Sequence, residues 1–249
     1  MNIQSKEIII FDLDGTLAES RAEITPHMAQ LLSELLKSYK VSILSGASFE
    51  QLMTNVVSKL TNIDNLDKLI LLPTCGASFY QLENNAWNKL YSIDLSAEDK
   101  YHIIKAIKYC LNKVSFSIDQ IWGEQYQDKS TQVTFSALGN KSPKDIKMNW
   151  DADLKKRSEL RELVAQLLPN FEVKIGGTTS LDITPKGIDK AFGIKKLEEY
   201  LKINKDQMLF VGDAIFPGGN DYAVKQYGVE CILVTSPEDT MLVIGFLLN

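Results

Sequence analysis

Short apolar runs alternate with segments of helical periodicity at both ends of the chain. The runs with the length of buried strands are residues 8–10, 41–44, 69–72, 208–211 and 231–234. Between them, apolar residues recur every three or four positions, as they do after Thr25-Pro26, where a helix cap and a first-turn proline coincide. This alternation of strand and helix predicts a parallel sheet with helices on its faces.

The middle of the chain has a different pattern. Residues 79–87 alternate in polarity around a turn at 83–85, which predicts a hairpin. Further strands are expected at 132–136, 171–175 and 181–184, and further helices after Ser96 and over 154–168. Because strands and helices do not alternate strictly here, we expect a separate α+β domain. Its predicted range is 84–186, inserted into an α/β core domain made of residues 1–83 and 187–249.

Two carboxylates, Asp12 and Asp14, directly follow the first predicted strand. Residues two apart in an extended strand share a face, so both acids are directed at one point beyond the end of that strand. Three other polar residues are expected at the same edge of the sheet: Ser45 and Asp213 after later strands, and Lys190 at the start of a helix. Carboxylates suit Mg²⁺, and an ammonium group with a hydroxyl suits a phosphate. The pattern therefore predicts a site for Mg²⁺ and a phosphate group.

The composition is that of an acidic globular protein. The chain has 249 residues and a formal net charge of −5, so we do not expect nucleic acid to be its main binding partner. We expect no membrane span, because no run of about 18 apolar residues occurs, and no signal peptide at the N-terminus. Three scattered cysteines, Cys75, Cys110 and Cys231, fit free thiols in a reducing cytoplasm, and Cys75 is expected to be buried.

Four motifs, in order along the chain, resemble those of the haloacid dehalogenase superfamily. They are Asp12-Leu13-Asp14-Gly15-Thr16, Ser45, Lys190, and Gly212-Asp213 with the following Gly218-Gly219-Asn220-Asp221. The resemblance spans the whole chain and is to subfamily IIB, in which a large cap is inserted into a Rossmann-like core. Within that subfamily, the segments 176–182, 212–221 and 237–240 are most similar to the eukaryotic-type phosphomannomutase branch.

The resemblance implies a role for each motif residue. Asp12 would attack phosphorus and carry the phosphoryl group, and Asp14 would act as general acid and then general base. Asp12, Asp14 through its backbone carbonyl, and Asp213 would bind Mg²⁺, while Asp221 would order the waters of the metal or Lys190. The residues expected to hold the phosphate are Ser45, Gly46, Lys190 and Gly15.

The resemblance also implies the kind of partner, a small phosphorylated metabolite. The positions matching those that contact substrate in the family are Arg21, Lys129, Ser180, Asp182 and Asn220. We expect Ser180 and Asp182 to bond the hydroxyls of a sugar. The identity of the sugar is not fixed by the sequence, and a homodimer formed through the cap is left open.

The arginine content bears on the reaction, because a mutase must hold a second phosphate and arginine suits that task best. Beyond Arg21 the chain has only Arg157 and Arg161, whose acidic neighbours predict a solvated helix face. Where the phosphomannomutase cap carries arginines, this chain has Lys129 and Asn140. We therefore expect a Mg²⁺-dependent phosphatase acting on a sugar or polyol phosphate. The alternatives are a phosphomannomutase that clamps the second phosphate with Lys129 or Lys141, and a non-catalytic metabolite-binding protein.

Overall fold

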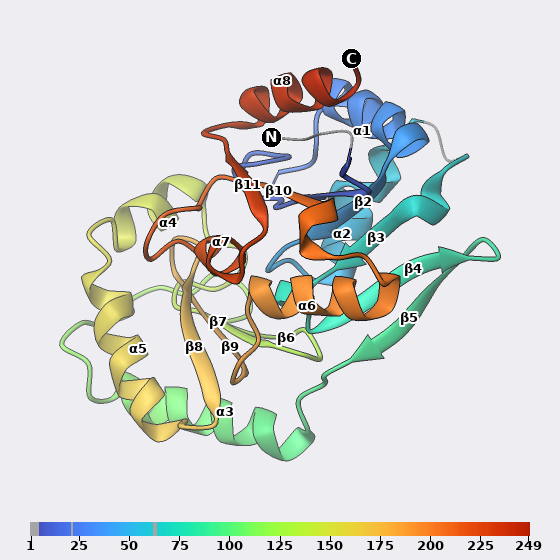
Figure 1. Ribbon diagram of the computed structural model, residues 1–249. Coiled ribbons are helices and arrows are strands. Elements are labelled where there is room, and N and C mark those ends of the chain that lie inside the picture. Colours follow the sequence, from blue (N-terminus) through green and yellow to red (C-terminus); the bar gives the residue numbers. More distant parts are fainter. Residues whose placement is uncertain (1–4, 21, 62–63) are drawn as a thin grey trace. The chain divides into compact units, whose positions relative to one another are not determined.

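A computed structural model describes residues 5–20, 22–61 and 64–249 (Figure 1). The chain forms two compact units. The first unit contains Met1–Ser92 and Ile188–Asn249, and the second contains Ile93–Gly187, so the second is inserted into the first. This arrangement confirms the predicted α/β class with an inserted α+β domain.

The first unit is built on one sheet whose strands come from both ends of the chain. In the order in which they pair, its strands in the described residues are β11 (Glu230–Leu233), β10 (Met208–Gly212), β1 (Ile8–Phe11), β2 (Lys40–Leu44), β3 (Leu69–Leu72), β4 (Ser78–Glu83) and β5 (Ala86–Ser92). The pairs from β11 to β3 are parallel, and β3, β4 and β5 pair antiparallel. The strand order changes direction between β1 and β10, and ligands bind at such a point in sheets of this kind.

The β4–β5 hairpin turns as expected, but both of its strands belong to the core sheet. The first division between the units therefore lies at Ser92/Ile93, whereas the sequence analysis assigned residues 84–92 to the inserted domain. Alternating polarity predicts that a segment is a half-buried strand, but it does not say which sheet the strand joins. Tyr80 pairs with Leu71 of β3, and this pairing places the hairpin in the core.

Both faces of the core sheet are covered by helices. In β1, Ile9 and Phe11 pack on one face with α1 (Pro26–Ser38), α2 (Phe49–Asn55) and α8 (Pro237–Leu247). Ile8 and Ile10 pack on the other face with α6 (Lys190–Leu201) and α7 (Tyr222–Tyr227). Figure 1 shows α1 and α8 side by side, and these two helices are in contact. A strand buried on both faces reads as an unbroken apolar run, which is why the sequence predicted β1 well.

The helix starts follow from local hydrogen bonds. The Thr25 hydroxyl accepts from the Met28 N–H at the start of α1, and Ser48 with Gln51 forms the predicted capping box of α2. Short 3₁₀ turns connect other elements: η2 (Val57–Lys59), η3 (Leu66–Lys68), η4 (Thr74–Gly76) and η5 (Lys205–Gln207).

The inserted unit has an antiparallel sheet and an apolar core of its own. The strands pair in the order β6 (Tyr126–Asp128), β7 (Val133–Ser136), β9 (Ser180–Pro185) and β8 (Phe171–Gly176). Its helices are α3 (Ala97–Leu111), α4 (Lys144–Trp150) and α5 (Lys155–Leu167). Side chains of α3 and α5 pack with Val133, Phe135, Leu181 and Ile183 from one face of the sheet. The alternate residues of β7 and β9 are polar, so the opposite face of this sheet is polar.

None of the helices within the described ranges has the length and apolarity that crossing a membrane requires.

Close packing of two glycines sets the position of α6. The φ of Gly76 in η4 is +84°, and a Cβ added there would lie 2.4 Å from the Cα of Gly193 in α6. The absence of side chains at both positions lets the first turns of α6 approach the segment that follows β3. Since Lys190 is the first residue of α6, this contact helps to fix Lys190 at the carboxyl edge of the sheet.

We predict that Gly76→Ala destabilises the protein by about 2–4 kcal/mol, because it combines an unfavourable φ with overpacking. The matched control is Gly245→Ala in α8, where the new Cβ would meet no atom within 4 Å. We expect this control to be neutral or to stabilise by up to about 1 kcal/mol. Urea unfolding of both variants measures the difference, and equal stabilities would contradict the packing argument.

Candidate active site

The first acidic motif forms a tight loop at the carboxyl end of β1. The backbone N–H of Asp12 donates to the Val211 carbonyl of the neighbouring strand β10 at 3.0 Å, so Asp12 is held by the sheet itself. The Leu13 carbonyl then accepts hydrogen bonds from Thr16, Leu17 and Ala18, which turns the chain back on itself. Gly15 lies inside this turn with φ +80°, a backbone conformation that favours glycine.

A buried ammonium group lies beside Asp12. The Nζ of Lys190 is 2.7 Å from Asp12 Oδ1, and it also pairs with Asp221 Oδ1. All three side chains are almost completely buried: the Asp12 side chain is 5% exposed, and those of Lys190 and Asp221 are not exposed. An ion group in such surroundings is stable only when its charge is matched and its hydrogen bonds are made.

The structure defines Asp221 more sharply than the sequence did, which left its partner open between the waters of a metal and Lys190. Oδ1 of Asp221 binds Lys190, and Oδ2 accepts from the Ala214 N–H at 3.1 Å. A Cβ on Gly212 would lie 2.4 Å from the same Oδ2, so glycine at this position makes room for the carboxylate. Asp221 thus ties Lys190 to the segment that follows β10.

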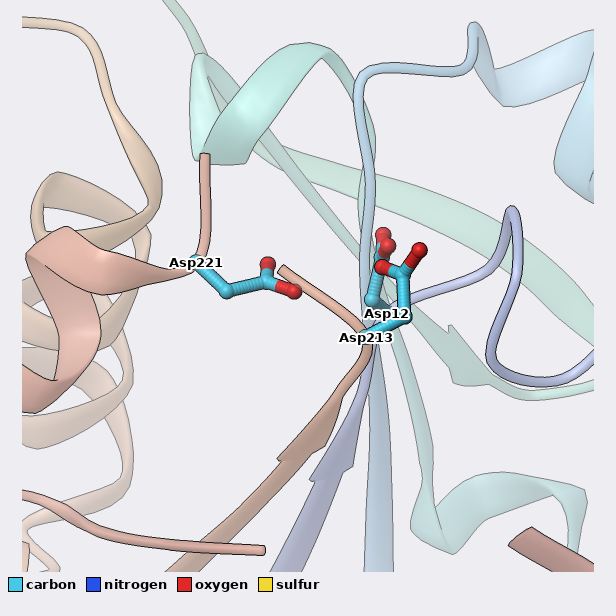
Figure 2. A group of neighbouring side chains, drawn as sticks. All are labelled: Asp12, Asp213 and Asp221. Atoms are coloured by element: carbon cyan, nitrogen blue, oxygen red, sulfur yellow. The ribbon is translucent and has the colours of Figure 1, made fainter. Parts of the chain in front are cut away.

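Three carboxylates gather at this edge. Asp12, Asp213 and Asp221 each offer an oxygen atom, and these three atoms lie within 4.8 Å of one another. Figure 2 shows the Asp12 and Asp213 carboxylates close together at the ends of β1 and β10, with the Asp221 carboxylate directed toward them. A Cβ on Gly15 would lie 2.4 Å from Asp213 Oδ2, so the turn after Asp14 also depends on glycine.

The pKa values of Asp12, Asp213 and Lys190 show that the cluster holds more negative than positive charge. Burial raises the pKa of Asp12 to about 7; Lys190 opposes this shift, and Asp221 adds to it. Burial, and then the Asp221 charge, also raise the pKa of Asp213 above its usual value. For Lys190, burial alone would lower the pKa, but Asp12 and Asp221 outweigh it and raise the pKa above its usual range. One ammonium group therefore does not neutralise the cluster, and hard oxygen ligands with uncompensated charge fit a divalent cation such as Mg²⁺.

Ser45 ends β2 at the same edge. It is 1% exposed, and its Oγ accepts from the Ala47 N–H at 3.1 Å. Its backbone carbonyl accepts from the Cys75 N–H, so the ends of β2 and β3 are joined here, next to the half-buried Gly46. Cys75 itself is half-buried rather than buried as expected.

The other expected contact residues are distributed differently. Asn220 is exposed in the segment before α7. Lys129, Ser180 and Asp182 all belong to the inserted unit: Lys129 lies in the turn between β6 and β7, and the other two lie on β9. Arg21 lies outside the described residues.

The structure corrects the interpretation of Arg157 as part of a solvated face. Arg157 is 4% exposed, and its Nε donates to Asp151 Oδ2 at 2.7 Å. Its other nitrogens donate to the carbonyls of Asp151 and Gly177. The spacing of Arg157 and Arg161 in a helix gave no sign of Asp151, which precedes that helix. Arg161 does contact Glu162 and is 40% exposed, as expected of a solvated face.

Sequence reasoning missed two residues that hold Asp182. Gln132 Nε2 and Thr134 Oγ1 donate to Asp182 Oδ1 at 2.8 and 2.7 Å. Thr134 lies directly opposite Asp182 in the register of β7 and β9. The signal available in the sequence was the polar alternation of residues 132–136, which predicted a strand but not the partner of each side chain.

Comparisons with known proteins identify the family of this chain. A sequence model of the haloacid dehalogenase-like hydrolase family matches residues 9–224. A phosphomannomutase of Spinacia oleracea is 28% identical over 242 residues, which cover 94% of this chain and 92% of that protein. A probable phosphomannomutase of Caenorhabditis elegans is 27% identical and covers 95% of this chain and 93% of its own length.

Solved structures show the same fold. An IMP-nucleotidase of Plasmodium falciparum aligns with a TM-score of 0.69 at 17% identity, over 98% of this chain and 68% of that one. A trehalose-6-phosphate phosphatase of Aspergillus fumigatus aligns with a TM-score of 0.57 at 17% identity, over 99% of this chain and 96% of that one. At these identities the likeness concerns the fold alone.

We predict that Asp12→Asn stabilises the metal-free protein more strongly at pH 8 than at pH 5. The usual pKa of an aspartate is 3.8, and that of folded Asp12 is about 7, so the folded state binds more protons between these values. Wild-type stability is therefore lost as pH rises through this range, and the amide removes that loss. Thermal melts in chelator should show the Tm difference growing by about 5 °C or more from pH 5 to pH 8. A difference that is constant or shrinks with pH would contradict the account of Asp12.

Proposed function

Because the chain belongs to the haloacid dehalogenase-like hydrolase family, we propose that it is a Mg²⁺-dependent phosphatase acting on a small sugar or polyol phosphate. The observation that carries the proposal is the cluster of Asp12, Lys190, Asp213 and Asp221 at the carboxyl ends of β1 and β10. We place the enzyme in the cytoplasm, in keeping with three cysteines, Cys75, Cys110 and Cys231, that form no disulfide with one another.

In the proposed reaction Asp12 is the nucleophile. One of its carboxylate oxygens attacks phosphorus, a bond to that oxygen forms, and the ester bond to the sugar oxygen breaks. Lys190 keeps Asp12 in a fixed orientation at 2.7 Å and offsets part of the negative charge that repels a phosphate dianion. Asp221 acts through Lys190, whose ammonium group it also holds.

Asp14 moves the protons in both steps. In the first step it gives a proton to the leaving sugar oxygen, and in the second it takes one from the water that hydrolyses the aspartyl phosphate. Both steps return Asp14 to its starting state, so the net reaction is ester plus water to alcohol plus phosphate. The tight turn at Gly15 supports this role, because its hydrogen bonds fix the backbone of the loop that carries Asp14, two residues after the nucleophile Asp12.

Asp12, Asp213 and the Asp14 backbone carbonyl would hold Mg²⁺. Bound there, the metal supplies positive charge that offsets the carboxylates and the phosphoryl oxygens. The Ser45 hydroxyl oxygen already accepts from Ala47, so its hydrogen is suited to donate to a phosphoryl oxygen, next to the backbone of Gly46 and Gly15. Asn220 and Arg21 are proposed to contact the substrate from the core unit.

The arginines of the inserted unit favour hydrolysis over intramolecular transfer. All residues of this unit are described; Arg157 is engaged by Asp151 and Gly177, and Arg161 by Glu162. At the position where the related cap strand carries an arginine, Asn140 accepts through Oδ1 from the Glu124 N–H at 3.1 Å. Arg157 is therefore committed within the unit, and Asn140 offers no guanidinium group for the second phosphate that a mutase requires.

A phosphomannomutase is the second candidate, and the names of the relatives favour it. In that case Lys129 or Lys141 would hold the second phosphate as a point charge. In either case Ser180 and Asp182 are proposed to bond sugar hydroxyls.

We predict that the purified protein, with Mg²⁺, releases phosphate from p-nitrophenyl phosphate and from at least one of a panel of hexose and polyol phosphates. Activity should be lost in chelator and restored by added Mg²⁺, because the cluster needs a cation to bring its charge into balance. Mannose 1-phosphate should not be converted to mannose 6-phosphate, even with a hexose bisphosphate as activator.

Isomer conversion without net phosphate release would favour the mutase. Binding of a sugar phosphate with no turnover would support a non-catalytic metabolite-binding protein and overturn both enzymatic proposals.

A further inference from the structure

The carboxylate of Asp182 is held by hydrogen bonds from two neighbouring side chains of the inserted unit. Thr134 Oγ1 donates to Asp182 Oδ1 at 2.7 Å. Gln132 Nε2 donates to the same oxygen at 2.8 Å and to Thr134 Oγ1 at 2.9 Å. Gln132 and Thr134 are both at least 95% buried, so these bonds form away from bulk water.

The direction of every bond in this set is fixed. A carboxylate only accepts, so the amide nitrogen of Gln132 and not its oxygen must face Asp182. The single hydroxyl hydrogen of Thr134 is used on Asp182, so Thr134 can only accept from Gln132. Oδ1 of Asp182 thus has two donors, and Oδ2 is left to receive a further one.

Gly176 of β8 determines the position of that second oxygen. A Cβ added at Gly176 would lie 2.3 Å from Asp182 Oδ2, much closer than real Cβ atoms approach other atoms. Any side chain at this position would therefore push the carboxylate away. The φ of Gly176 is not positive, so space, rather than backbone conformation, accounts for the glycine.

We infer that Gln132, Thr134 and Gly176 are positioning residues that fix Asp182, the residue proposed above to bond a sugar hydroxyl, as a single oriented acceptor. The inference rests on the proposed function. A carboxylate fixed in this way favours a substrate group that donates a hydrogen bond, and it disfavours a second phosphate or a carboxylate at the same place. It selects for a polyhydroxyl body at this point of the substrate and against an anionic one.

The test compares Thr134→Val with Thr184→Val. Thr184 lies two residues after Asp182 on the same face of β9; it is 5% exposed, and its hydroxyl has no hydrogen-bond partner among the described residues. Both variants replace a buried hydroxyl with a methyl group, but only Thr134→Val removes a donor to Asp182. Thr134→Ser keeps the hydroxyl and serves as the rescue.

The quantity measured is the ratio of kcat/KM for the best hexose or polyol phosphate of the panel to kcat/KM for p-nitrophenyl phosphate, which has no hydroxyl for Asp182 to bind. We expect Thr134→Val to lower this ratio about tenfold or more, since a hydrogen bond to a charged group is lost. Thr184→Val should leave the ratio unchanged, and Thr134→Ser should restore most of it. In an Asp182→Asn background, Thr134→Val should cause little further loss, as expected of residues that act through Asp182.

An unchanged ratio in folded Thr134→Val, or equal losses in Thr134→Val and Thr184→Val, would overturn the inference and leave the phosphatase standing. Wild-type protein that prefers p-nitrophenyl phosphate to every member of the panel would also overturn it. If p-nitrophenyl phosphate is not hydrolysed with Mg²⁺ either, the proposed function fails as well, so the two failures are distinguishable.

Discussion

The buried ammonium group of Lys190 is the part of this structure on which the other parts of the candidate site depend. It lies between Asp12, which ends β1, and Asp221, which begins α7, and it joins three elements that are far apart in the sequence. Lys190 reaches this place because α6 begins there, and α6 is packed through Gly193 against Gly76. Removing the ammonium group would leave the Asp12 and Asp221 carboxylates buried without a counter-charge, which is more costly than losing the whole group of charges.

The same cluster carries a charge imbalance that folding alone would not favour. Burial raises the pKa of both Asp12 and Asp213, and Lys190 offsets only part of their charge. A protein selected for stability alone would replace such a group with apolar side chains. The imbalance is useful if a divalent cation and a phosphate group occupy the site together, because carboxylates, metal and phosphoryl oxygens then balance one another. On this view, the cost in stability and the proposed catalysis have one electrostatic cause.

The sequence predicted the core well because a parallel sheet buried on both faces leaves a strong pattern, as in Ile8–Ile10, and because acids at strand ends need an explanation. It was less informative where an outcome depends on a partner distant along the chain. The β4–β5 hairpin was recognised but assigned to the wrong unit, because alternation does not identify the neighbouring strand. Arg157 was interpreted as solvated because only its helix neighbours were visible, whereas Asp151 and Gly177 decide its position. Gln132 and Thr134 were overlooked for the same reason.

The central claim is that this cluster makes Asp12 a nucleophile toward phosphorus. The most direct test is to mix the Mg²⁺-loaded enzyme with a hydrolysable phosphate ester, quench it in acid within milliseconds and map covalently bound phosphate by mass spectrometry of its peptides. The account predicts one phosphoryl group on the peptide that contains Asp12, labile to hydroxylamine as an acyl phosphate is. Turnover with no bound phosphate at any quench time, or phosphate on a residue other than Asp12, would contradict it.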